Sequence, residues 1–174
     1  MEYRELYSEY ASMLQDKAEY QNSLALLKDG YISTKTISGK KYAYLQYRVN
    51  GKLFSEYVKG DRLPEVCAEL DKRAVLLDRI REIDERLEKI EAAAEILDKS
   101  LHRKLVILRR CAAMEMMSVE ERGKSLAFGS AMTALEGIPS SDETEKNLSG
   151  WAAGDLSFQE SYLKTLQTYH LAEV

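Results

Sequence analysis

The sequence predicts a mainly α-helical protein with a small β insert. We expect an antiparallel coiled-coil helical hairpin bearing a three-stranded antiparallel meander, followed by a C-terminal three-helix module. Three observations predict this class: apolar residues recur every 3.5 positions in two stretches, a segment between them is rich in Tyr, Thr, Ile and Val, and serine-led helix starts punctuate the last third. The expected domains are 1–117, the hairpin with its meander, and 118–174, the three-helix module.

The first two helices are predicted by apolar positions that alternate three and four residues apart. The first series, interrupted only by a lysine, is Tyr3, Leu6, Tyr10, Met13, Lys17, Tyr20, Leu24 and Leu27. The second series is Leu76, Ile80, Ile83, Leu87, Ile90, Ala94, Leu97 and Leu101. Such a repeat places one narrow apolar stripe on each helix, so the two stripes are expected to pair within one chain. The second helix is predicted to be about twice as long as the first, which leaves its far half for a second copy of the chain or for the C-terminal helices.

Three short strands are expected between these helices, at 31–37, 41–49 and 52–58. Ser38-Gly39 and Asn50-Gly51 separate them, and Asn-Gly between strand-like runs is a strong hairpin signal because both residues accept positive φ. Gly30 is expected to end the preceding helix. The run GYISTKTISGKKYAYLQYRVNGKLFSEYVKG, with its flanking helices, resembles an uncharacterised domain of bacterial mobile-element proteins. That resemblance covers roughly the first half of the chain. It implies that the gene lies on or near a mobile element and says little about the activity of the protein.

The middle strand predicts a surface that combines aromatic and basic side chains. Alternation places Tyr42, Tyr44, Gln46 and Arg48 on one face. Lysines lie nearby, and tyrosines with cations suit base stacking and phosphate contacts. The candidate nucleic-acid contacts are Lys35, Lys40, Lys41, Tyr42, Tyr44, Arg48 and Lys52. In the alternative interpretation, the tyrosines pack on the helix ends and the lysines keep the sheet edges soluble.

The C-terminal module is predicted from three capping boxes, in which a serine and a glutamate three residues later satisfy each other's backbone N–H groups. The boxes begin at Ser118, Ser140 and Ser157, and they predict helices at 119–136, 141–153 and 158–170. The inner face of the first helix is expected to comprise Leu126, Ala127, Ser130, Ala131, Ala134 and Leu135. So small a bundle buries little apolar surface by itself, which favours docking on a partner.

The order of these features resembles the antitoxin VbhA family, whose members inhibit Fic adenylyltransferases. The resemblance rests on Leu135-Glu136-Gly137, Ile138-Pro139-Ser140, a tryptophan at Trp151 and Gly154-Asp155-Leu156-Ser157, and covers about the last third of the chain. It implies that Glu136, followed by Gly137, enters the partner enzyme and pairs with an arginine of the nucleotide site, so that ATP cannot place its γ-phosphate productively. The pattern prefers Ser or Thr four residues before the glutamate; this chain has Met132 there, with Thr133 one residue later.

Three residues of this module are candidates for docking on the partner: Thr133, Trp151 and Phe158. Trp151 could instead belong to the core of the bundle, as large aromatic residues usually do. Glu136 could be an ordinary exposed glutamate beside a glycine that ends the helix. A carboxylate at a helix C-terminus opposes the macrodipole by roughly 0.3–1 kcal/mol, so a partner or a function could compensate for its presence.

Composition excludes several other classes of protein. No P-loop, H-E-x-x-H or G-x-S-x-G motif is present, so we expect a binding protein that is not an enzyme and has no cofactor. Cys67 and Cys111 are solitary and the two histidines lack neighbouring ligands, so no metal site is expected and a reducing cytoplasm is favoured. No apolar run is long enough to span a bilayer, so we expect no membrane association.

Two functions therefore remain open. The first is an antitoxin-like inhibitor or regulator that docks through its C-terminal helices on a protein partner, a Fic-type enzyme, with the coiled coil as a spacer or as the interface of a homodimer. The second is a phage or mobile-element protein that uses its basic sheet to bind nucleic acid. In this second case the protein could also block a nucleic-acid-handling defence enzyme such as a CRISPR nuclease. Residues 28–62 carry eight basic side chains against three acidic ones, which agrees with the second function.

Overall fold

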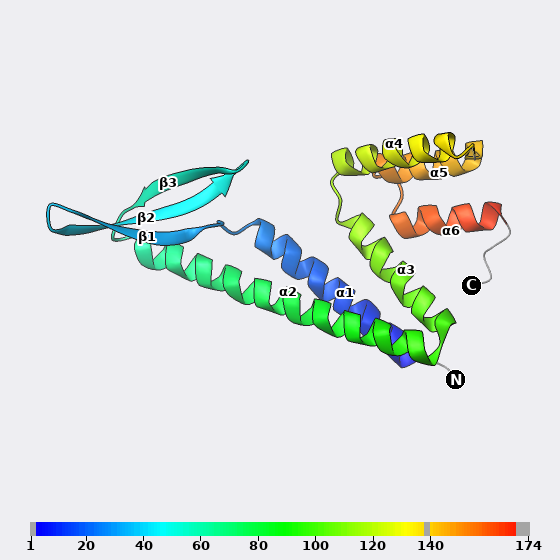
Figure 1. The fold of residues 1–174 in the computed structure, drawn as a ribbon, viewed down its shortest axis with the longest axis horizontal. Helices are drawn as coiled ribbons and strands as arrows, with labels where there is room; N and C mark the ends of the chain where they lie inside the picture. The colour runs from blue at the N-terminus through cyan, green and yellow to red at the C-terminus, as the bar shows by residue number, and fades with distance from the viewer. Residues whose placement is uncertain (1–2, 138–139, 170–174) are drawn as a thin grey trace. The chain divides into compact units, whose positions relative to one another are not determined.

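The structure is a computed structural model that describes residues 3–137 and 140–169. The chain divides into two compact units (Figure 1): the first ends at Leu97 and the second begins at Asp98. The expected boundary after residue 117 is therefore too late. Asp98 has an extended backbone, with φ −158° and ψ 107°, and its carboxylate accepts hydrogen bonds from the N–H groups of Ser100 and Leu101. One helix ends here and a new one is capped, so the apolar series that continues to Leu101 spans two helices.

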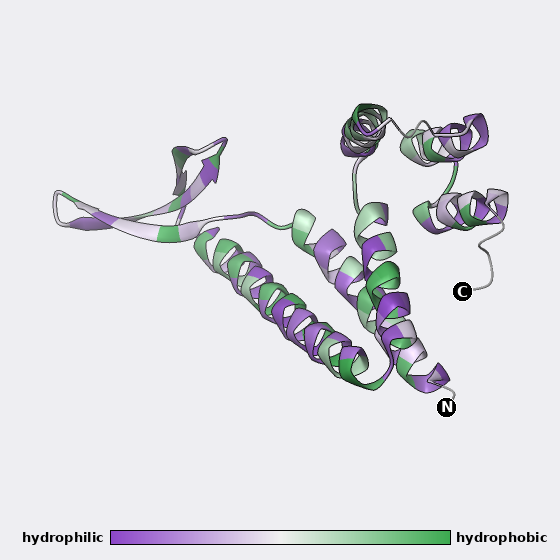
Figure 2. Cartoon of the chain, turned by 45° about the vertical axis from the view of Figure 1, so that its right-hand side comes forward, coloured by the Kyte–Doolittle hydropathy of each residue, from purple (hydrophilic) through white to green (hydrophobic). Residues whose placement is uncertain are grey.

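The first unit is built on two antiparallel helices, α1 (Arg4–Ala25) and α2 (Leu63–Leu97). The predicted pairing is confirmed. Tyr10, Met13 and Leu14 of α1 are buried, as are Leu87 and Ala94 of α2. Hydrophobic and hydrophilic residues are mixed along both helices (Figure 2), as expected of helices with one apolar stripe.

Polar pairs fix the alignment of α1 with α2. Lys17, which interrupts the apolar series, reaches Asp84 with a nitrogen–oxygen distance of 2.6 Å. Two seam positions before Lys17, the Tyr10 hydroxyl donates a hydrogen bond to Glu91. A higher residue number in α1 thus pairs with a lower one in α2, as expected for antiparallel helices. Lys17, which interrupts the apolar series, therefore stabilises the helix pair through its ion pair with Asp84.

The three predicted strands form one antiparallel sheet in the order β1-β2-β3. Their bounds are Tyr31–Ile37, Lys40–Val49 and Lys52–Val58, so the middle strand begins one residue earlier than expected. Both turns have two residues with positive φ: 51° and 76° at Ser38 and Gly39, and 50° and 78° at Asn50 and Gly51. These turns set the register, which pairs Ile37 with Lys40 and Val49 with Lys52.

One face of the sheet packs on the beginning of α2, beneath the sheet in Figure 1. Leu45 and Val58 of the sheet and Val66 of the helix form the buried centre. Around it lie the partly buried residues Ile32, Ala43, Tyr47, Leu63 and Leu70. The sheet of the same chain covers the start of α2, which the sequence interpretation did not include. The expected contact of this long helix with a second copy of the chain or with the C-terminal helices stays a prediction.

The second unit contains four helices, α3 (Lys99–Glu115), α4 (Val119–Leu135), α5 (Asp142–Ala153) and α6 (Phe158–Thr168). Capping boxes begin α4 at Ser118 and α6 at Ser157, as expected. The second predicted box was wrong, because Ser141 rather than Ser140 caps α5, and it accepts from the N–H of Thr144. His170, the last residue of the predicted third helix, lies outside the described residues.

The helix α4 is rotated about its axis relative to the sequence expectation. Its inward side carries Arg122, Leu126 and Thr133, whereas Leu135, expected inside, is 82% exposed. Arg122 explains this rotation, because its guanidinium donates hydrogen bonds to three backbone carbonyl groups and so turns its side of α4 inward. In the described part of the chain, no helix combines the length and the apolar character that crossing a bilayer requires.

Candidate functional site

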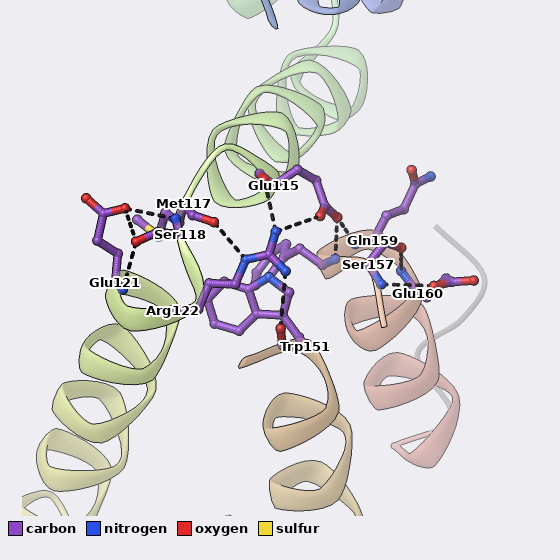
Figure 3. A network of polar contacts seen from close by, with 10 residues as sticks. Glu115, Met117, Ser118, Glu121, Arg122, Trp151, Ser157, Gln159 and Glu160 are labelled. Carbon is purple, nitrogen blue, oxygen red and sulfur yellow. Dashed lines mark hydrogen bonds and ion pairs between the residues drawn. The ribbon is translucent and has the colours of Figure 1, made fainter. Parts of the chain in front are cut away.

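The second unit is organised around the guanidinium group of Arg122 (Figure 3). Its Nε donates to the carbonyl of Met117 at 3.0 Å, Nη1 to the carbonyl of Trp151 at 3.3 Å, and Nη2 to the carbonyl of Glu115 at 2.9 Å. The side chain is only 13% exposed and its carbon Cζ lies 5.8 Å from the centre of the Trp151 ring. One side chain thereby joins the end of α3, the start of α4 and the end of α5, because an arginine has a planar fork of donors.

Glu115 extends this network to the last helix. Its carboxylate lies 3.7 Å from Nη2 of Arg122 and accepts hydrogen bonds from the backbone N–H groups of Phe158 and Gln159 (Figure 3). These N–H groups belong to the first turn of α6, where a helix has unsatisfied donors and a positive dipole end. The ion pair therefore fixes where α6 begins relative to α3 and α4.

The three predicted docking residues lie mainly inside the unit. Trp151 is 2% exposed and packs edge-on against Phe158, with ring centres 5.0 Å apart. The Thr133 hydroxyl donates to the carbonyl oxygens of Gly129 and Ser130 in its own helix. Trp151 therefore belongs to the core, the alternative that the sequence left open, whereas Thr133 and Phe158 are half-buried and their docking role stays a prediction.

A cavity of about 260 Å³ lies beside these residues. Its lining comes mainly from α4 and α5 and is apolar or small: Met114, Ser125, Leu126, Gly129, Ser130, Thr133, Ser140, Leu148, Trp151 and Phe158. Small residues on the inward side of α4 leave this space unfilled. The side of α4 that faces the cavity is thus distinct from the side that faces solvent.

The outward side of α4 carries an apolar row, which we define as Phe128, Met132 and Leu135. Their exposed fractions are 70%, 41% and 82%. The spacing of four and three residues places them on one side of the helix. Glu136 follows four residues after Met132, so it lies beside one end of this row, at the edge towards the cavity side. Among the described residues of this unit no element covers the row, and an exposed apolar patch favours an interaction surface.

Glu136 and Gly137 end the helix as the sequence predicted. The N–H of Glu136 still bonds to the carbonyl of Met132 at 3.1 Å, and Gly137 has a φ of 71°, which turns the chain away. The Glu136 side chain is exposed. Within the residues that the structure describes, no side chain forms a hydrogen bond or ion pair with its carboxylate.

The second candidate surface is the face of the sheet that does not pack on α2. Tyr42, Tyr44, Lys35 and Arg48 lie on this face, as predicted. Tyr57, which the sequence interpretation missed, completes it: its ring lies 5.7 Å from the ring of Tyr44 and 6.0 Å from that of Tyr42. The signal was present, because a two-residue turn at Asn50-Gly51 fixes Tyr57 opposite Tyr44.

Of the other predicted lysines, Lys40 lies on this face beyond Tyr42, whereas Lys41 and Lys52 alternate to the opposite face. Lys40 and Lys41 begin the middle strand, whereas Lys52 lies beyond its other end. A strand rises about 3.4 Å per residue, so the two groups are about 30 Å apart. The seven candidate contacts therefore form an aromatic centre with one lysine and one arginine, flanked by basic residues at both turns.

Among the residues of the described ranges, no group of His, Cys, Asp and Glu side chains is arranged to hold a metal ion. In the comparisons with known proteins, the family described as a domain of unknown function (DUF6788) matches residues 2–68, which contain α1, the sheet and the start of α2. No curated protein and no solved structure matches the chain.

Proposed function

We propose that this chain is a non-enzymatic inhibitor that docks on a partner enzyme through α4 and uses the Glu136 carboxylate to occupy an arginine of the partner's nucleotide site. The observation that carries the proposal is the juxtaposition of the exposed apolar row of α4 with the exposed Glu136 carboxylate at the end of the same helix, to which no side chain of the described residues bonds. The apolar row supplies affinity and the carboxylate supplies the inhibitory contact.

Burial of the row provides a substantial driving force. Phe128 and Leu135 are largely exposed, and covering one such side chain contributes about 1.5–3 kcal/mol. The residues that hold α4, above all Arg122 and Glu115, keep this row rigid before the partner arrives. Preorganisation of this kind reduces the entropy lost on binding.

The carboxylate has the chemistry that the inhibitory contact requires. An arginine that binds the phosphates of ATP presents a planar fork of N–H donors, and a carboxylate is its best-matched competitor. Gly137 ends the helix directly after Glu136, so the side chain stands at the tip of α4. The resemblance to the VbhA family makes a Fic-type adenylyltransferase the proposed partner.

The test uses the full chain and a Fic-type adenylyltransferase from the same host genome. Calorimetry gives the affinity, and transfer of labelled AMP from ATP gives the activity. The wild-type chain should bind and suppress transfer. Glu136→Gln should weaken binding by about 1.5–3 kcal/mol, yet at saturation it should leave transfer active. Phe128→Ser combined with Leu135→Ser should abolish binding.

Glu143→Gln is the matched control, because it removes the same charge from an exposed position on α5. It should bind and inhibit like the wild type. A Glu136→Gln chain that still inhibits fully at saturation would remove the proposed mechanism and leave α4 as a docking device. A wild-type chain that does not bind the enzyme would remove the proposal itself.

A further inference from the structure

The solvent face of the sheet combines three clustered rings with cations and no acid. The register places twelve residues there: Tyr31, Ser33, Lys35, Ile37, Lys40, Tyr42, Tyr44, Gln46, Arg48, Leu53, Ser55 and Tyr57. None is acidic. The acidic residue of the strands, Glu56, pairs with Leu45 and so lies on the face that packs on α2. We call these twelve residues the tyrosine face.

The rings of the tyrosine face are accessible and mutually braced. Tyr57 is 50% exposed and lies edge-on to Tyr44. Tyr42 lies on the other side of Tyr57, with the two ring planes inclined at 58°. Edge-to-face neighbours hold a ring in place while leaving part of its own face free, so the cluster offers rigid aromatic surface to a planar ligand.

Cations lie beside the rings. The Lys35 Nζ is 4.7 Å from the centre of the Tyr44 ring, and an Arg48 nitrogen donates to the Gly51 carbonyl at 3.1 Å. Lys35 is exposed on a long flexible side chain, so its ammonium can move from the ring to a phosphate when a base covers Tyr44. Arg48 uses one of its five donors in this bond and keeps the others for an anion.

We propose that the tyrosine face binds single-stranded nucleic acid, with bases stacked on Tyr44, Tyr57 and Tyr42 and phosphates held by Lys35 and Arg48. Stacking requires a base with a free face, which a duplex does not offer, so a single strand fits and a double helix does not. An acidic peptide would use the cations but not the rings. The inference is independent of docking by α4, because it rests on the first unit alone.

The basic turns extend the path of the strand. Between Tyr31 and Val58 there are five basic side chains and one acidic one. Lys40 and Lys41 mark one end of the middle strand and Lys52 the other, about 30 Å apart at 3.4 Å per residue. On the tyrosine face itself, Lys40 lies at one end of β2 and Arg48 lies near the other, whereas Lys41 and Lys52 alternate to the opposite face. A nucleic-acid strand that runs along β2 therefore meets a cation towards each end and rings at the centre.

Fluorescence anisotropy of the full chain tests this proposal. The probes are labelled oligo-dT and oligo-rU of about 12 nucleotides, within the usual site sizes, and a duplex of equal length. At low salt at least one of the two single strands should bind at least tenfold more tightly than the duplex. The probe that binds more tightly, oligo-dT or oligo-rU, shows whether the ligand is DNA or RNA. The logarithm of the binding constant should fall linearly with the logarithm of salt concentration.

Variants separate stacking from simple charge attraction. Tyr44→Leu combined with Tyr57→Leu should weaken binding at least tenfold, whereas Tyr44→Phe with Tyr57→Phe, which keeps the rings, should bind like the wild type. Lys35→Gln with Arg48→Gln should reduce the salt dependence. Lys72→Gln with Lys89→Gln removes the same charge from exposed positions of α2 and should have little effect. Circular dichroism checks that each variant is folded.

Three results would overturn the inference. The wild-type chain could fail to bind either single strand at low salt. The duplex could bind as tightly as the single strands, which would indicate non-specific charge attraction. The leucine variant could bind like the wild type while folded, which would leave the rings as packing, or as a protein contact, rather than as a stacking surface.

Discussion

Nη1 of Arg122 donates a hydrogen bond to the carbonyl oxygen of Trp151 at 3.3 Å, so a side chain near the start of α4 caps the backbone near the end of α5. This carbonyl is one of the last in its helix, and it also accepts a hydrogen bond from the N–H of Gly154 at 3.0 Å. The same guanidinium serves two further carbonyls and the Glu115 carboxylate. The stability of the second unit should therefore depend strongly on this one residue.

Arg122→Met keeps most of the apolar stem and removes the donors. It should lower the free energy of unfolding of the second unit by about 2–4 kcal/mol, because three partly buried backbone carbonyls and the Glu115 carboxylate each lose a donor at once. Urea unfolding followed by Trp151 fluorescence measures this, since the chain has one tryptophan. Lys124→Met is the control: it breaks an exposed pair with Glu120 and should change stability by less than about 1 kcal/mol. Equal effects of the two changes would contradict the role assigned to Arg122.

Gly30→Ala should destabilise the first unit by about 2–4 kcal/mol. Gly30 has a φ of 119°, and a Cβ atom there would lie 2.2 Å from the carbonyl oxygen of Gln46 in the neighbouring strand. Gly39→Ala is a matched control, because its φ is 76° but the space around it is open, so it should cost only about 1 kcal/mol. Hydrogen exchange of the strand amides reports on this unit. Comparable losses of protection in both variants would show that the close approach of Gly30 to Gln46 has no energetic role.

The capping glutamates should make the second unit less stable in acid. Hydrogen bonds from the Ser118 and Ser157 backbone N–H groups and hydroxyls lower the pKa of Glu121 and of Glu160 below the ordinary value of 4.5. A lowered folded-state pKa gives stability that is present above pH 4.5 and is lost as the pH falls through the lowered pKa. Glu121→Gln with Glu160→Gln should therefore be less stable than the wild type near neutral pH and nearly equal to it near pH ~3. The check is the urea midpoint at several pH values, and a constant difference at all pH values would contradict the assignment.

The two cysteines should differ in reactivity. Burial and the neighbouring Glu115 carboxylate raise the pKa of the Cys111 thiol above its ordinary value of 9.0, so little thiolate is present at pH ~8. Cys67 is half-buried. In a Cys67→Ser chain the remaining thiol should react with a disulfide reagent at least about tenfold more slowly than after unfolding. Rapid reaction of the folded Cys67→Ser chain would show that Cys111 is accessible.

The sequence was most informative about turns and helix starts, although it misplaced the cap of α5 by one residue. The turns at Ser38-Gly39 and Asn50-Gly51 predicted three strands because positive φ is possible for few residues, and the structure confirms them. The boxes at Ser118 and Ser157 predicted where α4 and α6 begin. In each case a few neighbouring residues satisfy their own backbone groups, so no distant contact was needed for the prediction.

Features that depend on distant contacts could not be predicted in the same way. The rotation of α4 follows from Arg122, whose acceptors lie up to 29 residues away in the sequence. The end of α2 at Leu97 was hidden because the apolar repeat continues through it, although Asp98 is a residue type that caps helices. Tyr57 could have been included in the predicted aromatic surface, because the two-residue turn at Asn50-Gly51 sets the register that places it opposite Tyr44.

The bond between Glu115 and the N–H of Phe158 joins positions 43 residues apart. A ribosome synthesises the chain from its N-terminus, so α3 and α4 emerge while the carboxylate that organises their junction still lacks its main partner. We therefore expect closure of this unit to be a late event of biosynthesis, because it requires residues 158 and 159 to have left the exit tunnel.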